Sequence, residues 1–218
     1  MKEQKKDLTS GALEALGIKK IFISQKKEIG EVLLNWEYAN RYEILDEDGG
    51  MLGAIEEEKK SLAHAVFIRS WGRCRNYNIT FYDNSHRHLM SIMRGFTFFG
   101  MSKVQVNDAS GRPIGYIKRV FPPLIKRIYG VFDGKDHRLG LIKGSLFHPW
   151  TFKIYDMNEI DSGMICKKWS GALREVFTDA DNFMLDTEGS TAGDTFKKIM
   201  LAAVIVIDFD FFENTANK

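Results

Sequence analysis

Cysteine is scarce in this sequence. Its 218 residues include two cysteines, Cys74 and Cys166, which lie far apart and beside no other cluster of ligand-type residues. This distribution disfavours both a disulfide framework and a cysteine-rich zinc site, and it fits a protein kept in a reducing compartment. Proline is also rare, at 4 residues, whereas 44% of the chain is hydrophobic and 16 residues are Phe. A chain of this length and composition can bury one sizeable core, so one domain is expected.

An excess of charge of either sign is also absent. The sequence has 31 Lys and Arg against 29 Asp and Glu, for a formal net charge of +2. Such a balance argues against a dedicated polyanion binder and makes nucleic acid a disfavoured partner, while a local basic patch stays open.

Enzyme motifs are missing as well. The sequence contains no GxSxG, no Gly-rich phosphate loop and no HExxH. His86 and His88 could supply two metal ligands, but no neighbouring Cys or carboxylate set completes a site. We therefore predict a protein that is not an enzyme and has no certain cofactor.

The ends of the chain carry no targeting signal. The first residues are charged and lack the apolar region of a secretory signal, Lys2 stands where myristoylation needs glycine, and no cysteine ends the chain. We expect a location in the cytoplasm or on the cytoplasmic face of a membrane.

One stretch near the C-terminus, residues 195–213, is apolar on every side over most of its length. A helix of that kind must be buried in protein or lipid. Spanning a bilayer takes about 20 apolar residues, and this run is shorter and ends in Asp208 and Asp210, so burial in protein is the better interpretation. The side chains expected inside are Ile199, Leu201, Val204, Ile205, Ile207, Phe209, Phe211 and Phe212.

Between residue 19 and this helix, short alternating segments are separated by turn residues. Alternation bounded by Gly, Asp and Asn is typical of antiparallel hairpins. About a dozen strands at ~10-residue spacing predict a mainly β protein, a closed antiparallel barrel whose wide lumen the helix fills, with its acids at the mouth. Residues 1–18 are expected to be a mobile charged segment, 19–213 the barrel domain with its helix, and 214–218 a tail.

Several blocks carry a resemblance to a known family: Ala39–Ile44, Tyr77–Asn84, Gly111–Arg119, Trp169–Phe183 and Ala202–Glu213. In order and spacing they are similar to the phospholipid scramblase family. The resemblance implies a tubby C-terminal-like fold, twelve strands around a central hydrophobic helix, and calcium-triggered, energy-independent movement of phospholipids between leaflets. Membrane-anchored members have a palmitoylated cysteine cluster between two middle strands, whereas the corresponding segment here, Arg94–Met101, has no cysteine.

Calcium ligands are the first site that the resemblance implies, through Asp179, Asp181 and Asp186. If these residues are tested as a helix-loop-helix calcium loop, the sixth position is Met184 rather than Gly, and the twelfth is Ser190 rather than Glu. The alternative is that the acids cap a strand and a turn.

An aromatic segment is the second candidate. Phe96, Phe98 and Phe99, flanked by Arg94, could dip into a membrane interface if exposed. The alternative is that they belong to the core, as most Phe residues do.

Basic residues form the third candidate. Lys118, Arg119, Lys126 and Arg127 could hold a phosphate or phosphoinositide headgroup; the alternative is solvated strand faces.

Two hypotheses for function follow. In the first, a scramblase-family protein acts at phospholipid membranes with anionic headgroups as partners, and mediates calcium-dependent movement of lipid. In the second, a soluble tubby-like module binds a headgroup, a protein or nucleic acid without transport. Insertion of the C-terminal helix is the less favoured variant, because each Asp costs about 2.5–3.5 kcal/mol near the centre of a membrane helix.

Overall fold

The computed structural model describes most of the chain between residues 20 and 212. The described ranges are 20–26, 40–58, 76–95, 102–120, 126–167, 182–188, 190 and 193–212. The predictions for residues 1–18 and for the tail lie outside these ranges, as do those for Phe96, Phe98, Phe99, Asp179 and Asp181.

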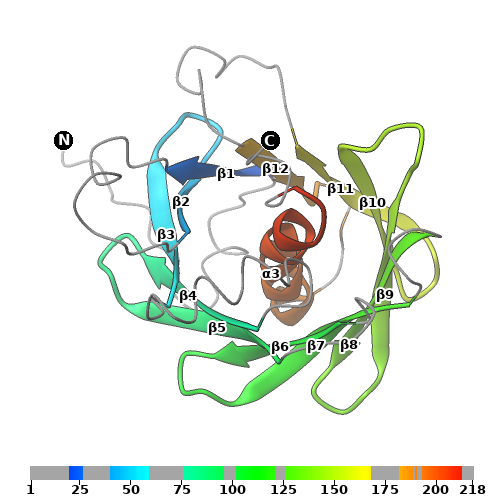
Figure 1. Ribbon diagram of the computed structural model, residues 1–218, viewed down its shortest axis with the longest axis horizontal. Coiled ribbons are helices and arrows are strands. Elements are labelled where there is room, and N and C mark those ends of the chain that lie inside the picture. Colours follow the sequence, from blue (N-terminus) through cyan, green and yellow to red (C-terminus); the bar gives the residue numbers. More distant parts are fainter. Residues whose placement is uncertain are drawn as a thin grey trace.

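The described strands form one closed antiparallel barrel, as predicted. Each strand pairs with its neighbours in the sequence, and β1 closes the ring by pairing with both β2 and β12. Viewed as in Figure 1, the strands surround helix α3, which lies in the middle of the ring. The strands are β1 (Lys20–Lys26), β2 (Arg41–Leu45), β3 (Met51–Glu57), β4 (Tyr77–Asp83), β5 (His88–Arg94), β6 (Lys103–Asp108), β7 (Pro113–Arg119), β8 (Arg127–Asp133), β9 (Arg138–Gly144), β10 (Thr151–Asp156), β11 (Asp161–Lys167) and β12 (Asn182–Asp186).

One tight turn is used repeatedly. In the β4–β5 hairpin, Asp83 Oδ1 accepts the backbone N–H groups of Ser85 and Arg87 at 2.9 and 2.8 Å. The backbone of His86 between them has a φ of 57°, the left-handed conformation that completes this kind of three-residue hairpin loop. The aspartate side chain therefore replaces missing backbone partners and fixes the turn.

The same turn closes five hairpins of the barrel. The turns span residues 46–50, 83–87, 108–112, 133–137 and 156–160. In one of them, hydrogen bonds from the Ser110 hydroxyl and the Arg112 backbone lower the pKa of Asp108 to about 2. The His137 backbone N–H likewise holds the pKa of Asp133 below its ordinary value. These five turns mark one end of the barrel, named here the turn end, and the opposite end is named the loop end.

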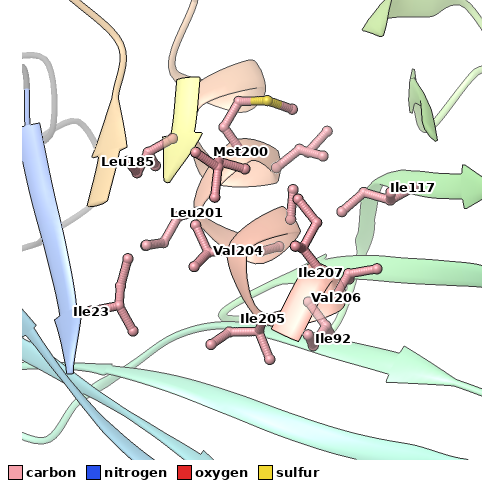
Figure 2. Close-up of a cluster of buried hydrophobic side chains, with 14 of the residues drawn as sticks. Ile23, Ile92, Ile117, Leu185, Met200, Leu201, Val204, Ile205, Val206 and Ile207 are labelled. Atoms are coloured by element: carbon pink, nitrogen blue, oxygen red, sulfur yellow. The ribbon is translucent and has the colours of Figure 1, made fainter. Parts of the chain in front are cut away.

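Helix α3 (Asp194–Phe211) fills the lumen, close to the predicted range 195–213. Every residue from Ile199 to Asp210 is buried, because a barrel of this size leaves an interior that its own side chains cannot fill. In Figure 2, side chains leave the helix on several sides, towards Ile23 and Leu185 on one side and Ile92 and Ile117 on another. The side chains predicted to lie inside are buried up to Phe209, while Phe211 and Phe212 are half-buried.

Glycine brings neighbouring hairpins close together near the turn end. A Cβ added at Gly140 would overlap the Tyr155 backbone oxygen and would lie 3.0 Å from Cε2 of Phe196 on the helix. Gly115, the equivalent residue of another hairpin, is enclosed in the same way by the Phe132 oxygen and by Ile199. Close approach of strand to strand and of sheet to helix therefore requires glycine here.

Gly140→Ala is expected to destabilise the protein by about 1–3 kcal/mol, because the overlap with a backbone oxygen cannot be relieved by a side-chain movement. The matched control is Gly95→Ala, since a Cβ at Gly95 meets nothing within 4 Å. Urea denaturation of both variants measures the difference. Equal stability of the two variants would show that the hairpins are not packed so closely.

Candidate functional site

Charged side chains gather inside the loop end of the barrel. Arg94, Arg119 and Lys167 are the last residues of β5, β7 and β11, and all three are buried. The helix reaches the same end with its C-terminus, which places Asp208 and Asp210 among them. These five residues are named here the ionic cluster.

Asp210 is the most enclosed member of the ionic cluster. Its Oδ1 accepts a hydrogen bond from Nη1 of Arg94 at 2.7 Å. Its Oδ2 accepts from Nη2 of Arg119 at 2.5 Å and from the Tyr129 hydroxyl at 2.7 Å. Three strands, β5, β7 and β8, are thus joined to one carboxylate of the helix.

Asp208 is joined to the opposite part of the ring. Its Oδ2 accepts from the Tyr42 hydroxyl on β2 at 2.7 Å, and its Oδ1 lies 3.4 Å from Nζ of Lys167 on β11. The two carboxylates together connect α3 to both sides of the barrel, because they are two residues apart on the helix and point in different directions.

Local electrostatics keep these groups in their charged or neutral forms. Burial alone would lower the pKa of Arg119, but the oxygens of Tyr129 and Asp210 raise it above its ordinary value. Burial and the Asp210 carboxylate raise the pKa of the Tyr129 phenol well above its ordinary value. The guanidinium therefore stays charged, and the phenol stays a neutral hydrogen-bond donor.

The cations also offset the polarity of the helix itself. The C-terminal end of a helix carries a partial negative charge, so acids in its last turns are unfavourable. The last turn of α3 has no basic residue of its own. The strand residues Arg94, Arg119 and Lys167 supply the missing positive charge, and the ionic cluster acts as a clamp on the helix.

The aromatic side chains at the end of α3 complete this clamp. The guanidinium groups of Arg119 and Arg127 lie 4.9 and 4.7 Å from the centre of the Phe211 ring. Nζ of Lys167 lies 4.2 Å from the centre of the Phe212 ring. Contacts of cations with aromatic faces are attractive, so the half-buried end of the helix is also held by basic residues.

The prediction that Arg94 and Arg119 contact lipid is wrong. Each is 1% exposed, and each is bound to Asp210. Lys118 and Lys126 are exposed as expected, and Arg127 is half-buried. The helix acids lie at one end of the barrel, as expected, but they are closed off from solvent there, since Asp208 and Asp210 are each 1% exposed. Buried carboxylates need buried cations as partners, so Arg94 and Arg119 lie inside the barrel and not on its surface.

Of the three predicted calcium ligands, only Asp186 lies in the described part of the chain. Its Oδ1 accepts the Glu188 backbone N–H at 2.9 Å, and its Oδ2 lies 3.8 Å from Nζ of Lys20. Within the described ranges, no three His, Cys, Asp or Glu side chains gather into a group that could hold a metal ion. Asp186 by itself does not fit a calcium site, which needs 6–8 oxygen ligands.

The sequence carries a signal for the ionic cluster. Arg94, Arg119 and Lys167 each follow a turn aspartate (Asp83, Asp108 and Asp156) by eleven residues. The hairpin is therefore a repeated unit, and in these three hairpins its last residue is a buried cation. Aligning the hairpins on their turn aspartates would have placed three cations at one end of the barrel.

The fold and the ionic cluster define a class of protein, a closed antiparallel barrel whose lumen is filled by its own C-terminal helix. Among the described residues, no helix has the length and apolar character needed to cross a membrane. A solved structure of a protein from Arabidopsis thaliana shares the fold, with a TM-score of 0.51 at 12% identity, over 88% of this chain and 91% of that one.

A family model described as Scramblase matches residues 4–214, so the chain belongs to the scramblase family. Phospholipid scramblase 1 of Mus musculus is 27% identical over 216 residues, which cover 92% of this chain and 63% of the mouse protein. Phospholipid scramblase 2 of Homo sapiens is 29% identical over 207 residues, which cover 89% of this chain and 68% of the human protein. The chain thus spans about two thirds of the length of these relatives. The predicted family and the predicted twelve-stranded fold are both confirmed.

Asp210→Asn is expected to lower the free energy of unfolding by about 3–5 kcal/mol, because it leaves two buried guanidinium groups without their counter-charge. The control is Glu159→Gln, which removes the partner of Lys143 in a surface ion pair of 3.2 Å. Exposed pairs contribute about 0–1 kcal/mol, so this change should be small. Urea denaturation measures both values, and equal losses would contradict a clamping role for Asp210.

Proposed function

We propose that this protein acts at phospholipid membranes and meets the lipid with its folded barrel, while α3 stays inside. The observation that carries the proposal is the ionic cluster, which holds both acids of the helix 1% exposed on three strand cations. Membership of the scramblase family, whose relatives include proteins named phospholipid scramblases, supports a membrane as the partner.

The energetics favour a helix that does not leave the barrel. Release of α3 would separate Arg94, Arg119 and Lys167 from the helix carboxylates and would empty the core of the barrel. In the bilayer, Asp208 and Asp210 would each cost about 2.5–3.5 kcal/mol near the centre of the helix. Both sides of the exchange are therefore unfavourable, and the outer surface of the barrel is left to contact lipid.

The finer part of the proposal is movement of phospholipids between leaflets. The family resemblance and the names of the relatives support it. The residues proposed to face the lipid are Phe96, Phe98, Phe99, Lys118, Lys126 and Arg127. In the sequence, the three phenylalanines follow the last residue of β5. Lys118 precedes the last residue of β7, and Lys126 precedes the first residue of β8.

Vesicles that contain the purified protein test both levels of the proposal. We expect the protein to co-sediment with anionic vesicles and to increase the fraction of a fluorescent lipid that dithionite quenches, since inner-leaflet lipid becomes accessible only by crossing. The variant Phe96→Ser/Phe98→Ser/Phe99→Ser should lose the increase.

Co-sedimentation without extra quenching would remove lipid movement and leave a membrane-binding module. Failure to co-sediment would contradict action at membranes altogether.

Calcium dependence is a separate expectation that rests on the resemblance. We expect calcium to increase the dithionite-accessible fraction in the wild type and not in Asp179→Ala/Asp181→Ala. Asp186→Asn serves as the comparison, because Asp186 already contacts Lys20 and the Glu188 backbone and is expected to change the response less. An identical calcium response in all three proteins would remove these acids from the proposal.

A second candidate function is binding of a phospholipid headgroup, a protein or nucleic acid without transport. The clamped helix favours it, because a barrel locked around its own helix offers no moving part for carrying a lipid across a bilayer. The quenching experiment separates this function from lipid movement.

A further inference from the structure

The connection between β9 and β10, residues 145–150, exposes large apolar side chains at the loop end. Phe147 is 93% exposed, Leu146 is 64% exposed and Trp150 is 44% exposed. These residues, named here the tip loop, read Ser-Leu-Phe-His-Pro-Trp and contain no acid. Phe147 is the most exposed large apolar side chain of the described residues, and a group of exposed apolar side chains of this kind marks an interaction site.

Hydrogen bonds hold the tip loop in a fixed shape. The Ser145 hydroxyl accepts the backbone N–H groups of Phe147 and His148 at 3.1 and 3.3 Å. Nη1 of Arg127 donates to the Pro149 oxygen at 2.9 Å, and the Lys167 N–H donates to the Trp150 oxygen at 2.8 Å. The phenylalanine is therefore held away from the barrel by an ordered loop, and this loop is attached to the strand that carries a cation of the ionic cluster.

Basic residues lie beside the tip loop. Arg127 pairs with Gly144 in the β8–β9 ladder, so exposed Lys126 is next to the start of the loop. Exposed Lys118 lies one residue from the loop end of β7, the strand beside β8. An apolar tip flanked by cations matches the interface of an anionic bilayer, where apolar and aromatic groups enter the headgroup boundary and cations face the phosphates.

The acids in this part of the barrel lie at the end opposite the tip loop. From Asn84 to Tyr155 the sequence contains twelve Lys and Arg but only three acids. The three acids, Asp108, Asp133 and Asp136, all lie in hairpin turns at the turn end. The loop end of β5 to β10 therefore has no acid of these segments, and an anionic surface would attract this end.

We propose that the tip loop docks the protein on anionic phospholipid membranes, with Leu146, Phe147 and Trp150 entering the interface and Lys118 and Lys126 facing the headgroups. This inference rests on the proposed function, because it names the surface by which the barrel meets a membrane. It adds a site to the phenylalanines predicted from the sequence, and it orients the barrel with its loop end towards the lipid.

A matched pair of variants tests the tip loop. Leu146→Ser/Phe147→Ser removes two exposed apolar side chains at the loop end, and Met157→Ser/Ile160→Ser removes two at the turn end, where Met157 is 62% and Ile160 is 61% exposed. In sedimentation with phosphatidylcholine vesicles containing about a third phosphatidylserine, we expect the first variant to bind at least about tenfold more weakly than the wild type. The second variant should bind as the wild type does.

A second measurement locates the tip directly and needs no loss of binding. Tryptophan is placed at position 147 by Phe147→Trp or at position 157 by Met157→Trp, and its fluorescence is compared with that of the wild type on vesicles of brominated phospholipid. We expect additional quenching for Phe147→Trp alone. Higher ionic strength should reduce binding of the wild type, and Lys126→Gln should reduce that dependence, since salt screens the contact of cations with headgroups.

Each outcome decides between the claims. If the wild type binds anionic vesicles while the loop-end variant binds equally well and position 147 is not quenched, the tip loop is overturned and action at membranes stands. If the wild type binds no vesicles, both are overturned. Equal binding to pure phosphatidylcholine would overturn the role of the lysines. Concentration-dependent dimers that only the tip variant lacks would make a second copy of the chain the occupant.

Discussion

The burial of two carboxylates at the end of an apolar helix is the constraint on which the rest of this structure depends. Asp208 and Asp210 lie where the helix is already negative, and both are 1% exposed. An unpaired charge in such a place is very costly, so cations must surround the helix end. Arg94, Arg119 and Lys167 meet this need from three different strands. The helix consequently has a defined depth and rotation in the barrel, which apolar contacts alone would define less sharply.

The repeated hairpin makes this arrangement possible. In each hairpin the aspartate stands at the turn between the two strands. The second strand ends eleven residues after it, at the opposite end of the barrel. Side chains at this last position face the lumen in several units, so one type of unit delivers Arg94, Arg119 and Lys167 to the same level. In the β8–β9 unit the position is Gly144, where an added Cβ would lie 2.6 Å from the Phe152 ring. In the β2–β3 unit the position is Glu57, which is also buried, so the five positions comprise three cations, one acid and one glycine.

Much of the fold could be predicted from local patterns. Turn residues between alternating segments indicated the barrel, and the apolar run indicated α3 to within two residues at each end. The ionic cluster could not be found in this way, because an arginine at a strand end has the same local pattern whether it faces water or the lumen. The local pattern therefore predicts a surface position for Arg94 and Arg119, although both are buried. Only the long-range pairing with Asp210, 116 and 91 residues away along the chain, distinguishes the two cases.

The same geometry gives the barrel two chemically different ends. Hydrogen bonds hold the turn aspartates as carboxylates, as at Asp108, where the Ser110 hydroxyl and the Arg112 backbone N–H lower the pKa to about 2. At the loop end, the repeated position directs cations inward to the helix, and exposed Lys118 and Lys126 add charge outside. The positive charge needed to bury the helix acids and the charge suited to an anionic surface therefore arise at one end. Because that end also carries the exposed Phe147, the clamp and the docking surface are joined through Arg127, which contacts both the Phe211 ring and the Pro149 oxygen. A membrane contact at the tip loop would therefore act, through Arg127, on the residues that hold the end of α3.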